Sequence, residues 1–108
     1  MISIYVTCHT GDEARRIAMA LVQARLIACA NIIPGVQSVY RWRGSIETET
    51  EVVMILKARD ADFDAICVAI KRLHSNEVPC ITVWPVEQAL PAYAEWVEKE
   101  TDRSAAGE

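Results

Sequence analysis

Two short stretches carry the residue types that could bind a metal ion. Cys8 and His9 are adjacent where a predicted strand meets a helix, and His74 lies at the predicted end of a second helix. A thiol near helix N–H groups has its thiolate favoured by the helix dipole, and neutral imidazole is a common metal ligand. A small buried cysteine beside a loop histidine, and a helix-capping His74, are the structural alternatives. Spacing alone does not predict that Cys8 and His74 meet.

The other cysteines and a row of carboxylates have structural explanations. Cys29 falls in an apolar run and Cys67 on the apolar stripe of a helix, so both are predicted to be core residues. Glu47, Glu49 and Glu51 alternate along one predicted strand. Such a row could coordinate a hard cation, but it is more typical of a solvated strand face.

Composition excludes several classes of protein. The chain has 108 residues, 52% of them hydrophobic, and 15 acidic against 11 basic residues give a net charge of −4. Without a basic block, nucleic acid and anionic membranes are not expected as partners. No apolar run approaches the roughly 20 residues of a spanning helix, and four cysteines without a Cys-x-x-Cys pair favour reduced thiols, so we expect a cytoplasmic protein. No Ser/His/Asp set or phosphate-binding glycine loop is present, and we expect no enzyme.

Hydrophobic periodicity predicts the elements that must position these residues. Alternation from Ile2 predicts a strand ending near Cys8 and His9, and Thr10 with Glu13 forms a capping box for a helix ending near Arg25. Residues 26–33 and 36–43 predict a long strand bent at Pro34-Gly35, followed by a turn at Gly44-Ser45 and a strand over 46–58. Trp42, between Arg41 and Arg43 near the end of this hairpin, could stack a ligand but fits a subunit boundary better.

The second half of the chain is predicted to contain a helix, a short strand and a last helix. Asp60 or Asp62 can cap a helix over residues 63–73, a short strand follows at 80–84, and Pro91 suits the start of a last helix. The order predicts a single ferredoxin-like βαββαβ domain of the α+β class with an additional C-terminal helix, covering residues 1–103. Residues 104–108 are predicted to be a frayed tail.

Two of the predicted strands are apolar on both faces. Residues 26–33 and 52–56 have apolar side chains at both parities, which indicates burial on both sides. Helices cover only one face of a ferredoxin-like sheet, so a homo-oligomer is the simplest cover for the other. The alternative is that the C-terminal helix folds over that second face.

Several segments resemble the CutA divalent-cation tolerance family. They read LIACANIIPGV at 26–36, SVYRWRGSIE at 38–47, EVVMILK at 51–57 and LHSNEVP at 73–79, and the likeness extends to Tyr93 and Trp96. The resemblance implies a tight homotrimer similar in architecture to PII signalling proteins, and a link to copper and other divalent cations. It also implies that Cys8 and His74 are the metal ligands.

The stretch after His74 departs from that family's pattern. Ser75 and Asn76 stand where the family usually has Pro-Tyr, and Cys80 stands where an acidic residue usually follows the proline. A thiol at Cys80 could replace the lost carboxylate as a softer ligand. We therefore expect a cytoplasmic trimeric metal-binding protein that acts in tolerance of divalent cations, above all of copper. The alternative is a PII-like signalling or scaffold trimer that binds a small ligand or a protein partner in clefts between subunits.

Overall fold

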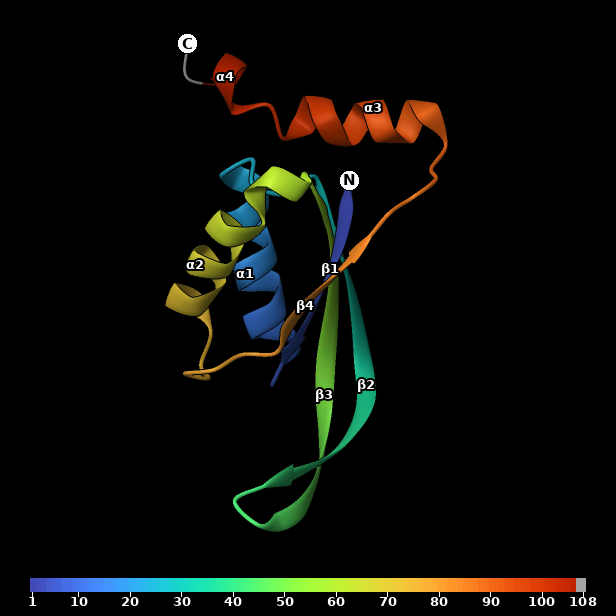
Figure 1. Cartoon of the computed structure of the whole chain (residues 1–108). Coiled ribbons are helices and arrows are strands. Elements are labelled where there is room, and N and C mark those ends of the chain that lie inside the picture. Colours follow the sequence, from blue (N-terminus) through green and yellow to red (C-terminus); the bar gives the residue numbers. More distant parts are fainter. Residues whose placement is uncertain (107–108) are drawn as a thin grey trace.

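Four strands form one antiparallel sheet within residues 1–106, the part of the chain that the computed structural model describes. The strands β1 (Ile2–Cys8), β2 (Cys29–Trp42), β3 (Ser45–Ala58) and β4 (Ile81–Pro85) lie in the order β2-β3-β1-β4. Helices α1 (Gly11–Gln23) and α2 (Phe63–Leu73) cover one face of the sheet (Figure 1). The predicted ferredoxin-like α+β fold is confirmed.

The core lies between the sheet and these two helices. Alternate residues of a strand point to the same face, and on β1 the even-numbered residues from Ile2 to Cys8 are all buried. Large buried side chains from β3, α1 and α2 surround them: Met54, Leu56, Ile17, Leu21, Ile66 and Ile70. Cys8 therefore ends the core-facing row of β1, and its direct sequence neighbour His9 lies just beyond the strand.

β2 and β3 form a hairpin that extends well beyond the helices (Figure 1). Its register shifts between Ile33 and Val36, and Gly35 there has a φ of 77°, so the bend predicted at Pro34-Gly35 is confirmed. Arg43 and Gly44 both have positive φ and join the paired residues at the hairpin end. Such a two-residue turn matches the twist of the strands, and it lies one residue before the predicted turn.

Helix α3 (Pro91–Glu100) crosses one end of the sheet (Figure 1). Val97 is buried there, and the Tyr93 hydroxyl lies 3.3 Å from the Cys29 sulfur. Elsewhere on the same face, Ile33 and Trp84 stay 44% and 51% exposed. The C-terminal helix therefore covers only one end of the second face within a single chain.

A short helical segment, η1 (Asp60–Asp62), precedes α2, and no side chain within residues 1–106 caps α2 with a hydrogen bond. The predicted capping role of Asp62 is wrong, because its carboxylate instead accepts hydrogen bonds of 2.7 and 3.0 Å from Arg103. Arg103 begins α4 (Arg103–Ala106), so the tail predicted to fray from Ser104 starts as a helical turn. Residues 107 and 108 of that predicted tail lie outside the described residues.

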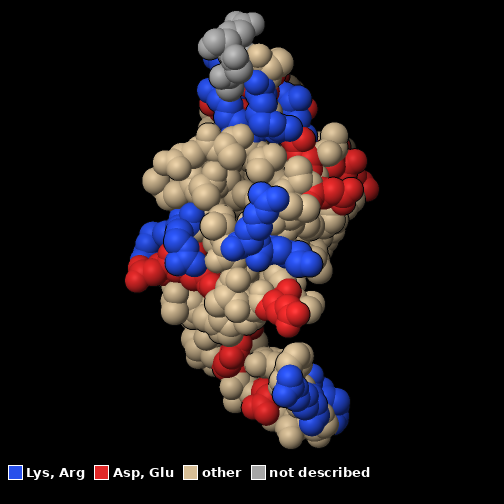
Figure 2. All heavy atoms as spheres, turned by 90° about the vertical axis from the view of Figure 1, so that its left-hand side faces the viewer, with Lys and Arg blue, Asp and Glu red and all other residues tan. Residues whose placement is uncertain are grey.

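Charged side chains are interspersed on the helix-covered side of the molecule. Figure 2 shows lysines and arginines in several separate groups with carboxylates among them, and one basic group at the end of the hairpin. Within the described residues, no helix combines the length and apolar character needed to cross a membrane.

Candidate metal centre

Cys8, Glu13 and His74 come together where β1 ends, α1 begins and α2 ends. Cys8 is the last residue of β1, Glu13 lies in the first turn of α1, and His74 directly follows α2. A sulfur, a carboxylate oxygen and an imidazole nitrogen lie within 4.8 Å of one another, and all three residues are buried. We call these residues the buried cluster.

The hydrogen bonds of His74 fix its tautomer. Nε2 lies 2.7 Å from the backbone oxygen of Thr7, which can only accept. Nδ1 lies 3.0 Å from the backbone N–H of Asn76, which can only donate. The neutral ring therefore carries its proton on Nε2 and offers a lone pair at Nδ1.

Glu13 ties three segments of the chain together. Its Oε1 accepts a hydrogen bond of 3.2 Å from the His9 N–H, and its Oε2 accepts one of 2.8 Å from the Ser75 N–H. Burial on its own would raise the pKa of Glu13, but these hydrogen bonds and the nearby His74 ring together lower it. The carboxylate is therefore ionised at neutral pH, although it is only 6% exposed.

The Cys8 sulfur is held as a thiol. Burial is the largest cause that raises its pKa, to about 11, and the negative charges of Glu13 and Glu51 add to it, whereas Arg16 opposes them. The predicted thiolate preference is therefore wrong, because burial and two carboxylates outweigh the helix dipole. A metal ion that binds this sulfur must displace its proton.

Residues 2–100 match the family model described as CutA1 divalent ion tolerance protein. The chain belongs to this family. "Protein CutA" of Mus musculus is 39% identical over 91% of this chain, which spans 55% of that protein's length. The "Divalent-cation tolerance protein CutA" of Archaeoglobus fulgidus is 37% identical over 92% of this chain and 96% of its own length.

Solved structures of the CutA1 family share the fold. One described as the periplasmic divalent cation tolerance protein CutA from Archaeoglobus fulgidus has a TM-score of 0.91 at 37% identity, covering 94% of this chain and 100% of its own. A Cut A1 structure from Thermus thermophilus has a TM-score of 0.89 at 34% identity, covering 93% and 98%. The resemblance read from the sequence is confirmed.

In this CutA1-family chain, the two predicted ligands, Cys8 and His74, lie in one cluster. The third member is Glu13, which the sequence predicted as part of the helix capping box. Half of the predicted capping box is present, because Thr10 accepts the Glu13 N–H at 3.1 Å. The Glu13 carboxylate, however, turns to the cluster. Cys80, the thiol that could replace a missing carboxylate, is exposed and lies outside the cluster, to which Glu13 supplies the carboxylate.

The departure at Ser75 has a local consequence. Proline has no backbone N–H, so the Pro-Tyr pair that the family resemblance implies could not donate at position 75. In this chain the Ser75 N–H donates to Glu13. The unusual residue therefore gives the Glu13 carboxylate an additional partner.

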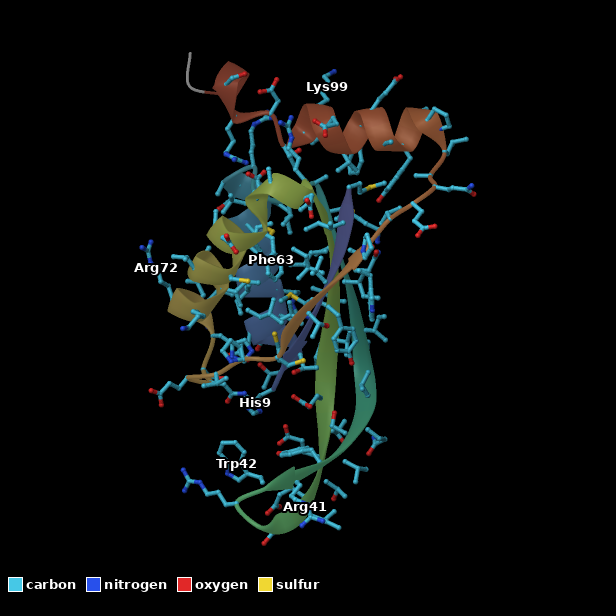
Figure 3. The ribbon with its side chains drawn as sticks, in the orientation of Figure 1. His9, Arg41, Trp42, Phe63, Arg72 and Lys99 are labelled. Carbon is cyan, nitrogen blue, oxygen red and sulfur yellow. The ribbon has the colours of Figure 1, made fainter. Side chains whose placement is uncertain are left out.

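A groove of about 890 Å³ lies beside the buried cluster, between the hairpin and residues 76–80. We call it the hairpin groove; its walls include Tyr5, Thr7, His9, Tyr40, Trp42, Glu49, Glu51, Asn76, Val78 and Cys80. His9 and Trp42 both lie on the side toward which the hairpin curls (Figure 3). The row of Glu47, Glu49 and Glu51 was expected to be a solvated face, but Glu51 is only 9% exposed and lies in this groove.

His9 is the basic group of the groove nearest to the cluster. Its Nε2 lies 2.8 Å from the Asn76 Oδ1, and its Nδ1 lies 4.0 Å from a Glu49 carboxylate oxygen. The hydrogen bond to Asn76 raises the pKa of His9 most, and Glu49, Glu13 and Glu51 raise it further against the opposing effect of burial. The groove therefore favours a protonated imidazole.

Cys29 and Cys67 are half-buried rather than core residues, so that prediction is wrong. Cys29 lies on the sheet face that α3 partly covers, where its hydrogen bond to Tyr93 and burial raise the pKa of Tyr93 to about 12. The pKa of Cys67 is raised by burial, and Asp64 adds to the effect. Neither cysteine belongs to the buried cluster.

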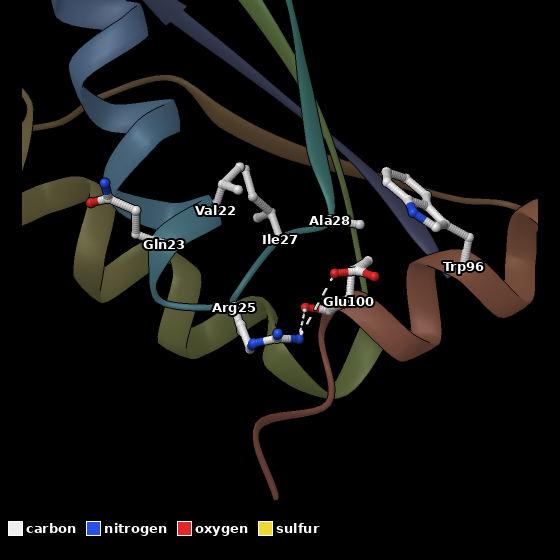
Figure 4. A pocket seen from close by; sticks show the side chains of 7 residues that line it. All are labelled: Val22, Gln23, Arg25, Ile27, Ala28, Trp96 and Glu100. Atoms are coloured by element: carbon white, nitrogen blue, oxygen red, sulfur yellow. Dashed lines mark hydrogen bonds and ion pairs between the residues drawn. The ribbon is translucent and has the colours of Figure 1, made fainter. Parts of the chain in front are cut away.

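A second cavity, of about 520 Å³, lies between the end of α1 and α3. Figure 4 shows Trp96 on one side of it and Val22 and Ile27 on the other. Arg25 donates to the Glu100 backbone oxygen at 3.2 Å and lies 3.9 Å from its carboxylate. These contacts connect the end of α1 to the end of α3, and Glu100 is the one residue of a metal-ligand type among the described residues that line the cavity.

Proposed function

We propose that this CutA1-family chain binds a divalent transition-metal ion, copper above all, at the buried cluster of Cys8, Glu13 and His74. The observation that carries the proposal is that three different ligand atoms lie within 4.8 Å of one another in the protein interior. Family membership supports a connection to divalent cations. The proposal assigns ion binding to the cluster, and no reaction.

The donor set suits borderline and soft ions. A thiolate and an imidazole favour copper and zinc over magnesium or calcium, which prefer oxygen ligands. Ligand atoms around one tetrahedral zinc ion lie about 3.3 to 3.8 Å apart, given bonds of about 2.0 to 2.3 Å. The ligand atoms, which lie within 4.8 Å of one another, must therefore approach by up to about 1.5 Å to hold an ion. Three protein ligands leave a further position open.

Calorimetric titration with zinc and, under reducing conditions, with Cu(I) tests the proposal. Cys8→Ser should weaken binding of both ions at least about 100-fold, because it removes the soft ligand. His74→Ala should weaken zinc binding more than Cu(I) binding. Cys67→Ser is the matched control, since it changes a half-buried cysteine outside the cluster and should leave both affinities unchanged.

The proposal fails if Cys8→Ser binds either ion as the parent does. It also fails if Cys67→Ser lowers affinity as much as Cys8→Ser. Circular dichroism of each variant separates loss of a ligand from loss of the fold.

We further propose that the protein works as a cytoplasmic homotrimer. The support for assembly is exposed apolar surface on the hairpin end, where Val39, Trp42 and Ile46 are 70%, 58% and 68% exposed. Apolar surface of this kind marks interaction sites. Four free thiols fit a reducing compartment.

Light scattering at micromolar concentration tests assembly, with about 36 kDa expected for three copies of the 12.0 kDa chain. Trp42→Ala should shift the protein toward smaller species more than Trp96→Ala, whose side chain lines the cavity beside α3. A dominant 12.0 kDa species in the parent would contradict the proposal.

The hairpin groove favours a second candidate function. Its volume of about 890 Å³ lies in the range of small-molecule sites, and it combines aromatic and carboxylate side chains. A PII-like signalling or scaffold trimer would place a ligand or partner in such a groove. Thermal shifts from a panel of metabolites and nucleotides, with no zinc or copper binding below high micromolar concentration, would favour this candidate.

A further inference from the structure

The His74 ring is already arranged as a metal ligand usually is. A ligating histidine commonly donates its other ring N–H to a backbone carbonyl, which fixes the tautomer and the ring orientation. Nε2 of His74 donates to the Thr7 oxygen at 2.7 Å. The lone pair at Nδ1 is the position left for an ion, and here it accepts the backbone N–H of Asn76 at 3.0 Å.

Asn76 connects the buried cluster to the hairpin groove. Its backbone N–H bonds His74, whereas its side-chain Oδ1 accepts a hydrogen bond from His9 Nε2 at 2.8 Å. Residue 76 also lines the groove, together with Val78 and Cys80. One residue therefore contacts a cluster ligand through its backbone and a groove residue through its side chain.

We propose that an incoming metal ion displaces the Asn76 N–H from His74 Nδ1, and that this displacement loosens residues 76–80 along the hairpin groove. The inference rests on the proposed metal-binding function and adds to it a means by which ion binding changes the groove. Asn76 acts as a positioning residue, because it holds the ligand nitrogen until the ion takes its place.

The hydrogen-bond chemistry of the cluster indicates why this bond is the one exchanged. An imidazole nitrogen has a single lone pair, so Nδ1 cannot hold the Asn76 N–H and a metal ion together. A carboxylate offers about four acceptor positions, so Glu13 can bind an ion and keep the N–H groups of His9 and Ser75. Ligation through Nε2 would require loss of its proton and of the Thr7 hydrogen bond.

Nuclear magnetic resonance of the isotopically labelled full chain, with and without zinc, tests the exchange. Zinc should move the ¹⁵N resonance of His74 Nδ1 and leave Nε2 protonated. The Asn76 amide should exchange with solvent at least about tenfold faster in the zinc-bound protein, because it has lost its acceptor. Amides of α1 and β1 within the core serve as internal controls and should keep their rates.

A pair of variants measures the coupling. Asn76→Ala retains the backbone N–H but removes the bond to His9, so residue 76 is easier to displace and zinc should bind about fivefold more tightly, as expected for one hydrogen bond. Gln37→Ala is the matched control, because it removes a side-chain amide of the same groove whose hydrogen bonds, within the described part of the chain, go to Thr50. Its zinc affinity should equal that of the parent.

The outcomes separate this inference from the function on which it rests. If zinc binds in a Cys8-dependent manner but the Asn76 amide stays protected and Asn76→Ala binds as the parent does, the exchange is wrong and the metal site stands. A shift of Nε2 in place of Nδ1 also overturns the exchange alone. If zinc does not bind, both proposals fail together.

Discussion

The buried cluster and the hairpin groove lie at the same end of β1 and begin with adjacent residues. Cys8 faces the core, whereas His9 lies in the groove with Glu49. Carboxylates raise the pKa of both side chains. The two side chains nevertheless differ in charge, because a raised pKa keeps the Cys8 thiol neutral and favours the charged form of the His9 imidazole.

This difference shows how neighbouring residues can be given different chemistry by the same negative charges. In the cluster, burial and the carboxylates both raise the pKa of Cys8, so its sulfur stays protonated. In the groove, burial opposes them, and the hydrogen bond to Asn76 has the largest effect on His9. A metal ion that binds in the cluster must therefore displace the proton of Cys8, whereas the groove favours protonation of His9.

Proton release gives the largest expected effect. Because the pKa of Cys8 is about 11, zinc binding should release one thiol proton at all pH values from 7 to 9. The affinity should therefore rise about tenfold per pH unit, or about 100-fold over this range. Calorimetry in two buffers of different ionisation enthalpy measures the number of protons released. Binding by His9 and Glu49 in the groove would instead become independent of pH once His9 is neutral.

Removing the charge of Glu13 should have the next largest effect. Glu13→Gln places an amide NH₂ against the N–H of His9 or Ser75, so one charge-assisted hydrogen bond is lost and a buried donor has no acceptor. We expect the free energy of unfolding to fall by about 1.5–3 kcal/mol at pH 7. Glu49→Gln, in the groove, should change it by less than about 0.5 kcal/mol. Urea denaturation of both variants measures the two values.

The contribution of the Glu13 carboxylate to folding stability should depend on pH. Its pKa is lower in the folded protein than its ordinary value of 4.5, so its contribution to stability is present above that pH and is lost as the pH falls through the lowered pKa. The difference between the parent and Glu13→Gln should be constant from pH 7 to pH 5 and narrow in stronger acid. Equal stability of the two at pH 7 would contradict the role given to this carboxylate.

Most of the fold could be predicted because it depends on local patterns. Alternation placed Cys8 at the end of a buried strand face, Pro34-Gly35 predicted the bulge, and Thr10 predicted the start of α1. Each of these features is decided by residues within a few positions of one another. The hairpin turn and most strand limits differed by about a residue, as at Arg43-Gly44. The start of β2 was predicted wrongly, because this strand begins at Cys29 and not at Leu26.

The cluster could be predicted only in part, because its contacts join distant segments. Glu13 and Ser75 are 62 positions apart, and Thr7 and His74 are 67 apart. No periodicity shows that the loop after α2 packs on the start of α1. The Cys8 pKa was predicted in the wrong direction for the same reason, since the helix dipole is a local effect and burial is not.

The smallest expected effect concerns the charge on His9. Because its pKa is raised above the ordinary 6.5 in the folded protein, protonated His9 stabilises the fold fully below that pH, and the contribution is lost as the pH rises through the raised value. His9→Gln should therefore be less stable than the parent at pH 5.5 by up to about 0.5 kcal/mol, because exposed ion pairs are screened by solvent. At pH 9 this charge-dependent difference should vanish, and 1 M salt should reduce it at pH 5.5. A difference that is the same at both pH values would mean that His9 acts in the groove through its hydrogen bond to Asn76 and not through its charge.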